Sequence, residues 1–421
     1  MNQRKGKFGD VGKKLYLCSM KTVRLLLTVL SVFAVSLHSH SENADSMMVD
    51  AMDSVEISLL TCSPHEEIYS LYGHTAIRIL DKRTGEDVAV NYGMFSFQKP
   101  YFVVRFIFGL TDYEIGIDSF ERFCRQYQYY GSSVTQQVLN LTNEEKGLIL
   151  AAINENYMPQ NRVYRYNYFY DNCTTRAVDM LTTHLPEAHV TFAGEDGKYP
   201  SFREMVHKCV DHHPWYRFGN DMLLGVMADR PTDKRGWQFL PAHAMADFDN
   251  AQIIGQDGSQ RQLVSRRETI VPAGVQTVEE DFPLRPNSVF LILLAITMAV
   301  TVAEAYSKKL LWGYDALLML LCGLAGIVLF LMLFSQHPTV RVNFQLLLLN
   351  PLPLFLLWRM IRRSRKEIPD KQFAGWTVLI CLFFIGGIWQ HYAEGMYLLA
   401  SSLLLRNVWR MSRQHQTKTS S

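Results

Sequence analysis

Hydrophobic residues divide the chain into two parts of different character. Residues 41–285 alternate short apolar runs with polar and aromatic residues, a pattern typical of a folded domain surrounded by water. Residues 286–408 are dominated by Leu, Ile, Val and Phe, in runs that approach or reach the length of a membrane span. The pattern predicts a globular domain followed by a transmembrane helical domain and a short tail at residues 409–421.

The second part contains five apolar stretches, of which the first two are long enough to cross a bilayer. The last three are shorter or are interrupted by Pro and Gly. Lys and Arg follow the first, third and fifth stretches, whereas the loop after the second has none between Ser335 and Val340. Basic residues in alternate loops satisfy the positive-inside rule for a cytoplasmic tail and an exported globular domain. The expected spans are residues 288–306, 312–334, 342–358, 373–389 and 392–406.

A shorter apolar run lies near the N-terminus. Lys21 and Arg24 precede the run Leu25–Leu37, after which the sequence turns polar. This order predicts a secretory signal peptide, with Met20 as the expected start of translation. A retained membrane anchor is the alternative. Residues 1–40 are therefore assigned to an N-terminal extension and signal peptide, in agreement with export of the domain that follows.

The globular domain mixes strand and helix patterns. Two capping boxes, Thr142 with Glu145 and Ser201 with Glu204, mark the starts of helices. The mixture predicts an α+β fold with an antiparallel sheet and segregated helices. The expected strands are residues 55–60, 76–80, 87–92 and 134–139, and the expected helices are residues 119–130, 141–157 and 201–211.

Composition and motifs narrow the range of possible functions. The chain has 42 Lys and Arg against 40 Asp and Glu, so its balanced charge does not favour nucleic acid as a partner. It has no glycine-rich phosphate or dinucleotide motif. The cysteines of the globular domain lack CxxC spacing, so they predict neither a zinc site nor a disulfide scaffold. We therefore expect no metal and no cofactor.

Cys173 is the candidate nucleophile. Asp171 and Asn172 are good N-cap residues, and apolar residues follow at helical spacing, so Cys173 is predicted in the first turn of a helix. The unpaired N–H groups and positive end of a helix favour a thiolate and can bind an oxyanion. The same place also suits a small buried residue that packs the helix start. Cys62 is a rival, but it precedes Ser63 and Pro64 rather than a helix.

His74 is the candidate base. It follows Gly73 in GHTAIRI and begins a predicted strand, on which His74, Ala76 and Arg78 share one face. Asn91, in VAVNYG, lies on the next predicted strand, and a hairpin across DKRTGED places it near His74. An amide there can hold the imidazole tautomer, as the third member of a Cys, His and Asn set. The rivals for this third role are Tyr72, Tyr92, Tyr166 and Asp171.

Five further residues near these motifs are candidates for binding substrate. Arg78 and Arg176 carry guanidinium groups that suit a lipid phosphate, although each also suits pairing with a carboxylate. Tyr72, Tyr166 and Asn172 flank the predicted base and nucleophile. The aromatic segments RYNYFYDN and FIFGL suit either a membrane interface or an ordinary core.

The order of these motifs resembles a known arrangement. Histidine on a strand before cysteine at a helix start resembles the circularly permuted papain-like enzymes, which include NlpC-type cell-wall peptidases and the lecithin:retinol acyltransferase group. More closely, GHTAIRI, VNYG, YNYFYDNCTTR and LLGVMADRPTD followed by FLP, with a multi-span tail, resemble the Lnb family of lipoprotein N-acyltransferases from Gram-negative bacteria. The resemblance covers the chain from about residue 54 onward.

The resemblance implies a role for each site residue. Cys173 is the implied nucleophile and His74 the base, with the third member at or near Asn91. An acyl chain is implied to move from a membrane phospholipid to the N-terminal diacylglyceryl-cysteine of a lipoprotein, through a thioester on Cys173 and without a cofactor. The implied fold is a permuted papain-like, NlpC-like domain on the periplasmic side, followed by a multi-pass bundle in the bacterial inner membrane. A membrane-tethered NlpC-like peptidase or amidase, and a non-enzymatic membrane scaffold, are the alternatives.

Overall fold

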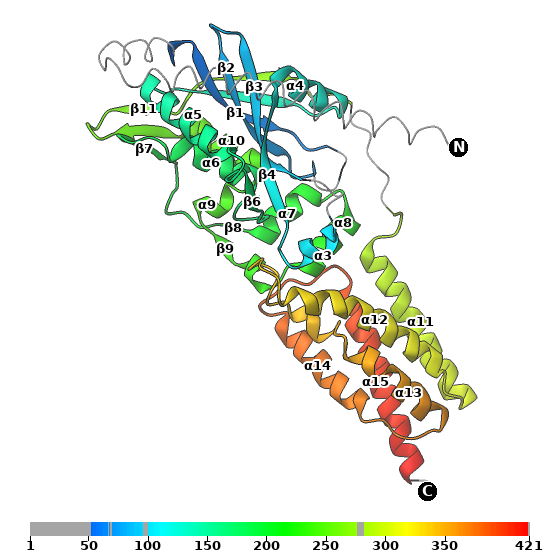
Figure 1. Cartoon of the computed structure of the whole chain (residues 1–421). Coiled ribbons are helices and arrows are strands. Elements are labelled where there is room, and N and C mark those ends of the chain that lie inside the picture. Colours follow the sequence, from blue (N-terminus) through cyan, green and yellow to red (C-terminus); the bar gives the residue numbers. More distant parts are fainter. Residues whose placement is uncertain (1–51, 66, 68–69, 96–99, 276–281, 420–421) are drawn as a thin grey trace, which may run out of the picture.

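A computed structural model describes residues 52–65, 67, 70–95, 100–275 and 282–419 of the chain. The predicted signal peptide lies outside the described residues. The molecule is elongated, with a sheet domain at one end and a helical domain at the other (Figure 1). The two regions correspond to the two parts that the hydrophobic pattern predicts.

The sheet domain is built on a sheet of seven strands in the order β12-β5-β1-β2-β3-β4-β6. Every pair of neighbouring strands is antiparallel, as the alternating runs predict. Strand β1, an interior strand between β5 and β2, is buried along nearly its whole length. The strands are β1 Val55–Cys62, β2 His74–Asp81, β3 Glu86–Met94, β4 Asp112–Ser119, β5 Val134–Leu139, β6 Val163–Arg165 and β12 Val264–Val271.

Helices cover both faces of this sheet. On one face, Ile77 and Val90 belong to the core that includes α5 (Asn143–Tyr157), α6 (Cys173–Thr182) and α10 (Pro241–Asn250). On the other face, Ala76 and Ala89 pack with Phe120, Phe123 and Tyr127 of α4 (Phe120–Tyr129). The alternation of side chains along β2 and β3 thus divides the core into two layers.

The helix starts follow the local sequence. Both predicted capping boxes form, at Thr142 for α5 and at Ser201 for α7 (Phe202–Val210). Each box satisfies backbone N–H groups that would otherwise lack partners. The remaining elements of the domain are α3 Phe102–Ile107, α8 Pro214–Leu223, η3 Val226–Asp229, α9 Lys234–Trp237, β7 Ala188–Thr191, β8 Tyr199–Ser201, β9 Pro231–Thr232, β10 Gln252–Gly255 and β11 Gln260–Gln262.

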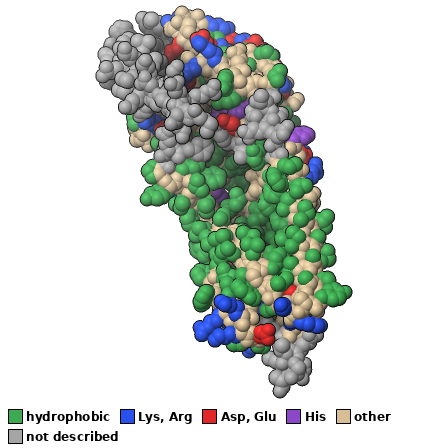
Figure 2. All heavy atoms as spheres, turned by 90° about the vertical axis from the view of Figure 1, so that its right-hand side faces the viewer, with side chains coloured by type: hydrophobic (Ala, Val, Ile, Leu, Met, Phe, Trp, Pro, Cys, Tyr) green, Lys and Arg blue, Asp and Glu red, His purple; other side chains and the backbone are tan. Residues whose placement is uncertain are grey.

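The helical domain contains α11 Pro286–Ser307, α12 Trp312–Met332, η4 Phe344–Leu347, α13 Leu352–Arg365, α14 Gln372–Gly386 and α15 Met396–Thr419. Three helices are long and apolar enough to cross a membrane, and they match the first three expected spans: Pro286–Ser307, Trp312–Met332 and the continuous segment Phe344–Arg365. The fourth, α14, is apolar but has only 15 residues. Figure 2 shows hydrophobic side chains covering the visible face of this domain, with Lys and Arg gathered at the end far from the sheet.

The fifth expected span coincides with the first half of α15, which carries buried charge. Arg406 forms ion pairs with Glu304 of α11 at 3.0 Å and with Asp315 of α12 at 2.7 Å. Arg410 pairs with the same Asp315 at 3.2 Å and hydrogen bonds Ser364 of α13. All five side chains are buried, so this network joins four helices and balances charges that an apolar environment would otherwise disfavour.

Buried polar contacts hold the two domains together. Gln345 donates to the carbonyl oxygen of Asp221 at 2.8 Å, and Asn343 donates to that of Met222 at 2.8 Å. Gln390 donates to the carbonyl oxygen of Leu224 at 3.1 Å. The C-terminal end of α8 is thus bonded directly to η4, to its N-cap Asn343 and to Gln390, which fixes the sheet domain relative to the candidate spans.

Candidate active site

The start of helix α6 is fixed by Asn172. Its side-chain oxygen accepts hydrogen bonds from the N–H groups of Thr174 and Thr175, each at 2.9 Å. Its amide nitrogen donates to the carbonyl oxygens of Tyr168 and Phe239. Cys173 therefore occupies the first helical position, where its own N–H has no acceptor within the helix. Asn172 is buried, and both its side-chain oxygen and its amide nitrogen are engaged in positioning the helix.

Helix α6 packs directly against the first residues of strand β2. The hydroxyl oxygens of Thr75 and Thr174 lie 3.1 Å apart, and both His74 and the N–H of Thr75 are near enough to the Cys173 sulfur to lower the pKa of its thiol. His74, the first residue of β2, is thus brought to Cys173, the first residue of α6. Residues 99 positions apart in the sequence are joined at the end of one strand.

Asn91 completes the group from strand β3. Its side-chain oxygen lies 3.1 Å from Nε2 of His74, so Nε2–H donates to the amide oxygen. The register pairs Asn91 with Ala76, on the same face of the sheet as His74. With Nε2 engaged by Asn91, Nδ1 is the ring nitrogen left for the thiol, and in the neutral ring it carries the lone pair that accepts a proton.

The thiol and the imidazole shift each other's pKa. Burial alone would raise the pKa of Cys173, but the charge of His74 and hydrogen bonds from His74, Thr75 and Thr174 lower it below its ordinary value. Burial would likewise lower the pKa of His74, whereas the Cys173 thiolate and hydrogen bonds with Cys173 and Asn91 raise it. Both directions favour a thiolate beside an imidazolium, which is the activated form of a cysteine nucleophile.

Gly93 of strand β3 lies next to Cys173. Its φ of +85° is a backbone conformation that glycine adopts readily. A side chain at this position would begin 3.7 Å from the Cys173 Cβ atom and 3.9 Å from the ring of Tyr166. The register of β3 against β4 also shifts between Asn91 and Met94. The irregular end of β3 therefore leaves room for Cys173 and Tyr166 against the sheet.

Aromatic rings form the other wall of the site. Tyr166 packs in the core cluster that Cys173 adjoins, and its ring stacks on Tyr113 at a centroid distance of 4.1 Å. Burial raises the pKa of Tyr166 well above its ordinary value, so this hydroxyl stays neutral. Tyr166 thus supplies an apolar surface beside the thiol rather than a base.

Two family models match the sequence of this chain. Residues 47–206 match the Lnb N-terminal periplasmic domain, and residues 277–418 match the Lnb transmembrane domain. The chain belongs to the Lnb family. Comparisons with curated proteins and with solved structures found no match.

Membership of the Lnb family decides the class of protein. This Lnb chain is a bacterial membrane protein with a periplasmic domain and a transmembrane domain. The periplasmic match includes Cys173, His74 and Asn91, whereas residues 207–276 lie in neither match.

Two other predicted residues of this Lnb-family protein are engaged elsewhere. The Arg78 guanidinium donates to Asp87 at 2.7 Å and 2.8 Å and to Gln136 at 2.6 Å, and it lies 3.7 Å over the ring of Phe120. Tyr72 accepts a hydrogen bond from Asn220 at 2.9 Å. The structure therefore does not bring the Arg78 guanidinium to the thiol.

Arg176 is also paired with a carboxylate. It donates to Asp171 at 2.6 Å and 2.8 Å, and its guanidinium lies 3.4 Å over the ring of Tyr164. Both Asp171 and Tyr164 lie beside the helix start, so Arg176 ties the segment before Cys173 to the first turn of α6. This contact corresponds to the carboxylate alternative that the sequence leaves open.

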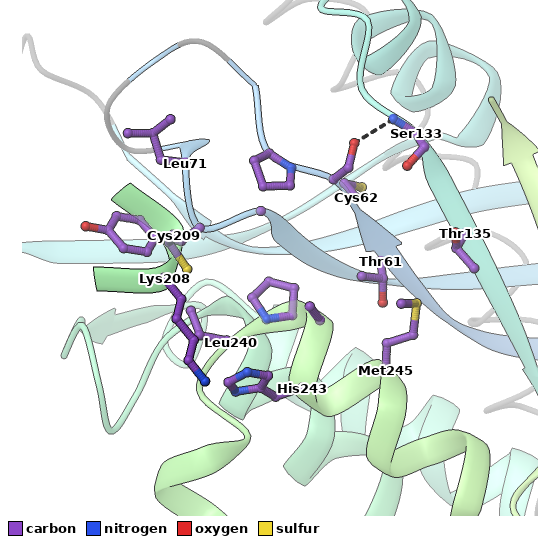
Figure 3. Close-up of a pocket in the computed structure, with 16 residues that line it drawn as sticks. Thr61, Cys62, Leu71, Ser133, Thr135, Lys208, Cys209, Leu240, His243 and Met245 are labelled. Atoms are coloured by element: carbon purple, nitrogen blue, oxygen red, sulfur yellow. Dashed lines mark hydrogen bonds between the residues drawn. The ribbon is translucent and has the colours of Figure 1, made fainter. Parts of the chain in front are cut away.

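A cavity of about 350 Å³ lies beside the site. Cys62 and Gly73 line it, and they are the strand partner and the chain neighbour of His74. Figure 3 shows Lys208 of α7 and His243 of α10 lying close together at its wall. Sequence patterns do not indicate either residue, because only the packing of α7 and α10 against the end of β1 makes them neighbours. Cys173 and His74 themselves are not among its lining residues.

No three His, Cys, Asp or Glu side chains in the described part of the chain are grouped as metal ligands.

Proposed function

We propose that this Lnb-family protein is a lipoprotein N-acyltransferase with Cys173 as its nucleophile. The acyl donor is a membrane phospholipid, and the acceptor is the N-terminal diacylglyceryl-cysteine of a lipoprotein. The observation that carries the proposal is the arrangement of Cys173, His74 and Asn91: a thiol at a helix start whose pKa is lowered by a neighbouring imidazole, and an imidazole whose Nε2 is held 3.1 Å from an amide oxygen.

The first half-reaction forms a thioester. His74 takes the proton of the Cys173 thiol, and the sulfur attacks the carbonyl carbon of the phospholipid ester. The N–H of Cys173, which has no acceptor within α6, supports binding of the negative oxygen that develops. The carbon–oxygen ester bond then breaks, and the imidazolium returns its proton to the leaving lysophospholipid.

The second half-reaction forms the amide. The neutral α-amine of the diacylglyceryl-cysteine attacks the thioester carbonyl, and His74 accepts the proton that the amine loses. The carbon–sulfur bond breaks and the Cys173 thiolate is restored beside the imidazolium. The ester supplies the energy for the transfer, so no nucleotide is consumed. Both substrates are lipids, so anchoring the thiol beside the bilayer raises its effective concentration toward them.

The proposal includes an architecture. A cysteine helix packed on an antiparallel sheet, with histidine and asparagine on adjacent strands, supports a permuted papain-like, NlpC-like domain over residues 41–285. Residues 286–408 cross the bacterial inner membrane five times, residues 409–421 lie in the cytoplasm, and residues 1–40 hold the signal peptide. The alternating basic loops support this orientation.

Trapping the thioester tests the proposal. The full chain is reconstituted in vesicles that contain phospholipid with a labelled acyl chain, and the label bound to protein is measured before and after hydroxylamine. We expect hydroxylamine-sensitive label on the natural sequence and on the control Cys124→Ser, and none on Cys173→Ala. The natural sequence staying unlabelled would contradict the proposal.

Analysis of cells separates the two alternatives. Loss of lipoprotein N-acylation in Cys173→Ala supports the transferase. Altered cell-wall muropeptides with normal lipoprotein N-termini indicate an NlpC-like peptidase or amidase. A Cys173→Ala protein that changes neither product and only unfolds at a lower temperature indicates a non-enzymatic scaffold.

A further inference from the structure

Helix α3 exposes several apolar side chains, while its one charged side chain is tied to neighbouring groups of the sheet domain. Its one charged residue, Arg105, donates to the carbonyl oxygen of Leu110 at 3.1 Å and pairs with Asp112 at 2.5 Å. By contrast, Tyr101 is 82% exposed, Val103 69%, Val104 51% and Phe106 41%. A helix in contact with water normally shows the opposite pattern. Four neighbouring apolar side chains on one short segment therefore indicate a surface that meets something other than water.

The position of α3 identifies what that surface meets. The carbonyl oxygen of Phe108, directly after α3, accepts a hydrogen bond from the N–H of Gln336 at 2.9 Å. A Cβ atom added at Gly109 would lie 3.1 Å from His337 and 3.2 Å from Gln336, so the chain passes close to both residues. These two residues follow α12, one of the three helices able to cross a membrane, and Phe334 at the same end is also exposed. Helix α3 thus lies beside the end of α12 that is nearer the sheet domain (Figure 1).

A row of aromatic rings connects α3 to the nucleophile. Phe102 of α3 stacks on Phe95 at 5.8 Å, and Phe95 contacts Tyr113 at 4.9 Å. Tyr113 stacks on Tyr166 at 4.1 Å, and Tyr166 lies beside Cys173. These ring contacts form a continuous apolar series from α3, beside the end of α12, to the core next to the thiol, and Tyr113 within it is buried. Such a series is of the kind that suits an acyl chain.

We propose that α3 is a lipid-contacting element: its exposed face enters the leaflet nearest the sheet domain, and the donor phospholipid reaches Cys173 along the row Phe102, Phe95, Tyr113 and Tyr166. The donor route rests on the proposed function, because it leads the acyl donor to the same thiol. The contact between α3 and lipid does not rest on the proposed function. Two experiments separate them.

The first experiment measures lipid contact without catalysis. A benzophenone amino acid replaces Val103 in one full-length variant and Leu148 of α5, which is 39% exposed, in another. Each variant also carries Cys173→Ala and is illuminated in vesicles of phosphatidylethanolamine and phosphatidylglycerol with labelled acyl chains. We expect lipid adducts at position 103 at least about tenfold above those at position 148. Equal labelling, or a protein adduct in place of lipid at 103, overturns the proposal.

The second experiment measures delivery of the donor. Thioester formation on Cys173 is followed with two donors, a bilayer phospholipid and a short-chain acyl thioester dissolved in water. The double variant Val103→Gln/Val104→Gln should lower the ratio of bilayer rate to soluble rate by about tenfold, the order expected from removing two apolar contacts with lipid. Leu148→Gln is the matched control and should leave the ratio unchanged.

The outcomes distinguish the two proposals. An unchanged ratio in the double variant overturns the donor route, and so does an equal loss of both rates, because that indicates a structural role for α3. If the natural sequence forms no thioester with either donor, the proposed function fails, while the lipid adducts still decide whether α3 contacts the membrane.

Discussion

Nε2 of His74 lies 3.1 Å from the side-chain oxygen of Asn91, across the neighbouring strands β2 and β3. Their pairing register is fixed by the hairpin, in which Ala76 faces Asn91. The hydrogen bond leaves Nδ1 of the same ring for the Cys173 thiol. The sheet therefore sets both the orientation and the proton position of the imidazole, and this relationship leads to the first prediction.

Replacing Asn91 should slow thioester formation without unfolding the protein. In Asn91→Ala the ring can rotate and can carry its proton on Nδ1, so we expect the rate to fall by about 10- to 100-fold. Asn91→Gln, which keeps an amide but moves it, should fall less. The measurement is the rate of label transfer to Cys173 from phospholipid. A rate equal to that of the natural sequence would show that the amide does not position the ring.

The reactivity of Cys173 should extend to unusually low pH. The pKa of Cys173 is lowered and that of His74 is raised, so the thiolate–imidazolium pair exists above the first pKa and below the second. Alkylation of Cys173 by iodoacetamide, followed by mass spectrometry against pH, should therefore begin below the ordinary range of a thiol. In His74→Ala the onset should move to higher pH, since the cation that stabilises the thiolate is gone. The same onset in both proteins would contradict the ion pair.

Gly93 should matter for both stability and the site, and Gly85 offers a matched comparison. Their φ angles are +85° and +76°, so alanine at either position carries a backbone penalty of about 1–2 kcal/mol. Only at Gly93 does the added carbon meet Cys173, at 3.7 Å, whereas nothing lies within 4 Å of the carbon added at Gly85. Thermal unfolding should show a similar loss in both variants. The rate of Cys173 alkylation should change only in Gly93→Ala. An equal change in Gly85→Ala would contradict a specific effect of Gly93 on the thiol.

The buried ion network of the helical domain should be needed for its assembly. Arg406→Met leaves Glu304 and Asp315 buried without their main cation, a change that typically costs about 3–5 kcal/mol. The triple variant Arg406→Met/Glu304→Gln/Asp315→Asn removes the unpaired charges and should recover part of that loss. Thermal unfolding in detergent measures both. Arg362→Met, at an exposed position of α13, is the control, and an equal effect there would contradict the prediction.

Local chemistry explains what was predictable about the fold. The strands around His74 and Asn91 and the two capping boxes follow from side-chain alternation and from hydrogen bonds three residues apart, which depend on near neighbours in the chain. The start of α6 at Cys173 follows from Asn172 in the same way. The division into a globular and a membrane part follows from apolar content alone.

Partners that are distant in the sequence were not predictable. Gln136 of β5 holds Arg78, and no local pattern connects residues 58 positions apart. The burial of Arg406 in α15 was likewise not predictable. A buried guanidinium among apolar helices is stable only when carboxylates such as Glu304 and Asp315 pair with it. Lys208 and His243 meet at the cavity only through the packing of α7 and α10.

The sequence by itself determined where helices and strands begin, which residues carry reactive chemistry, and which part of the chain is apolar, because these properties depend on composition and on contacts within a few residues. Only the tertiary structure decided that the His74 ring meets both Asn91 and Cys173, that Arg78 is held away from the thiol, and that α3 presents its apolar face beside the end of α12. Those relationships arise from the packing of helices on a sheet, where side-chain positions are set by neighbours that are remote along the chain.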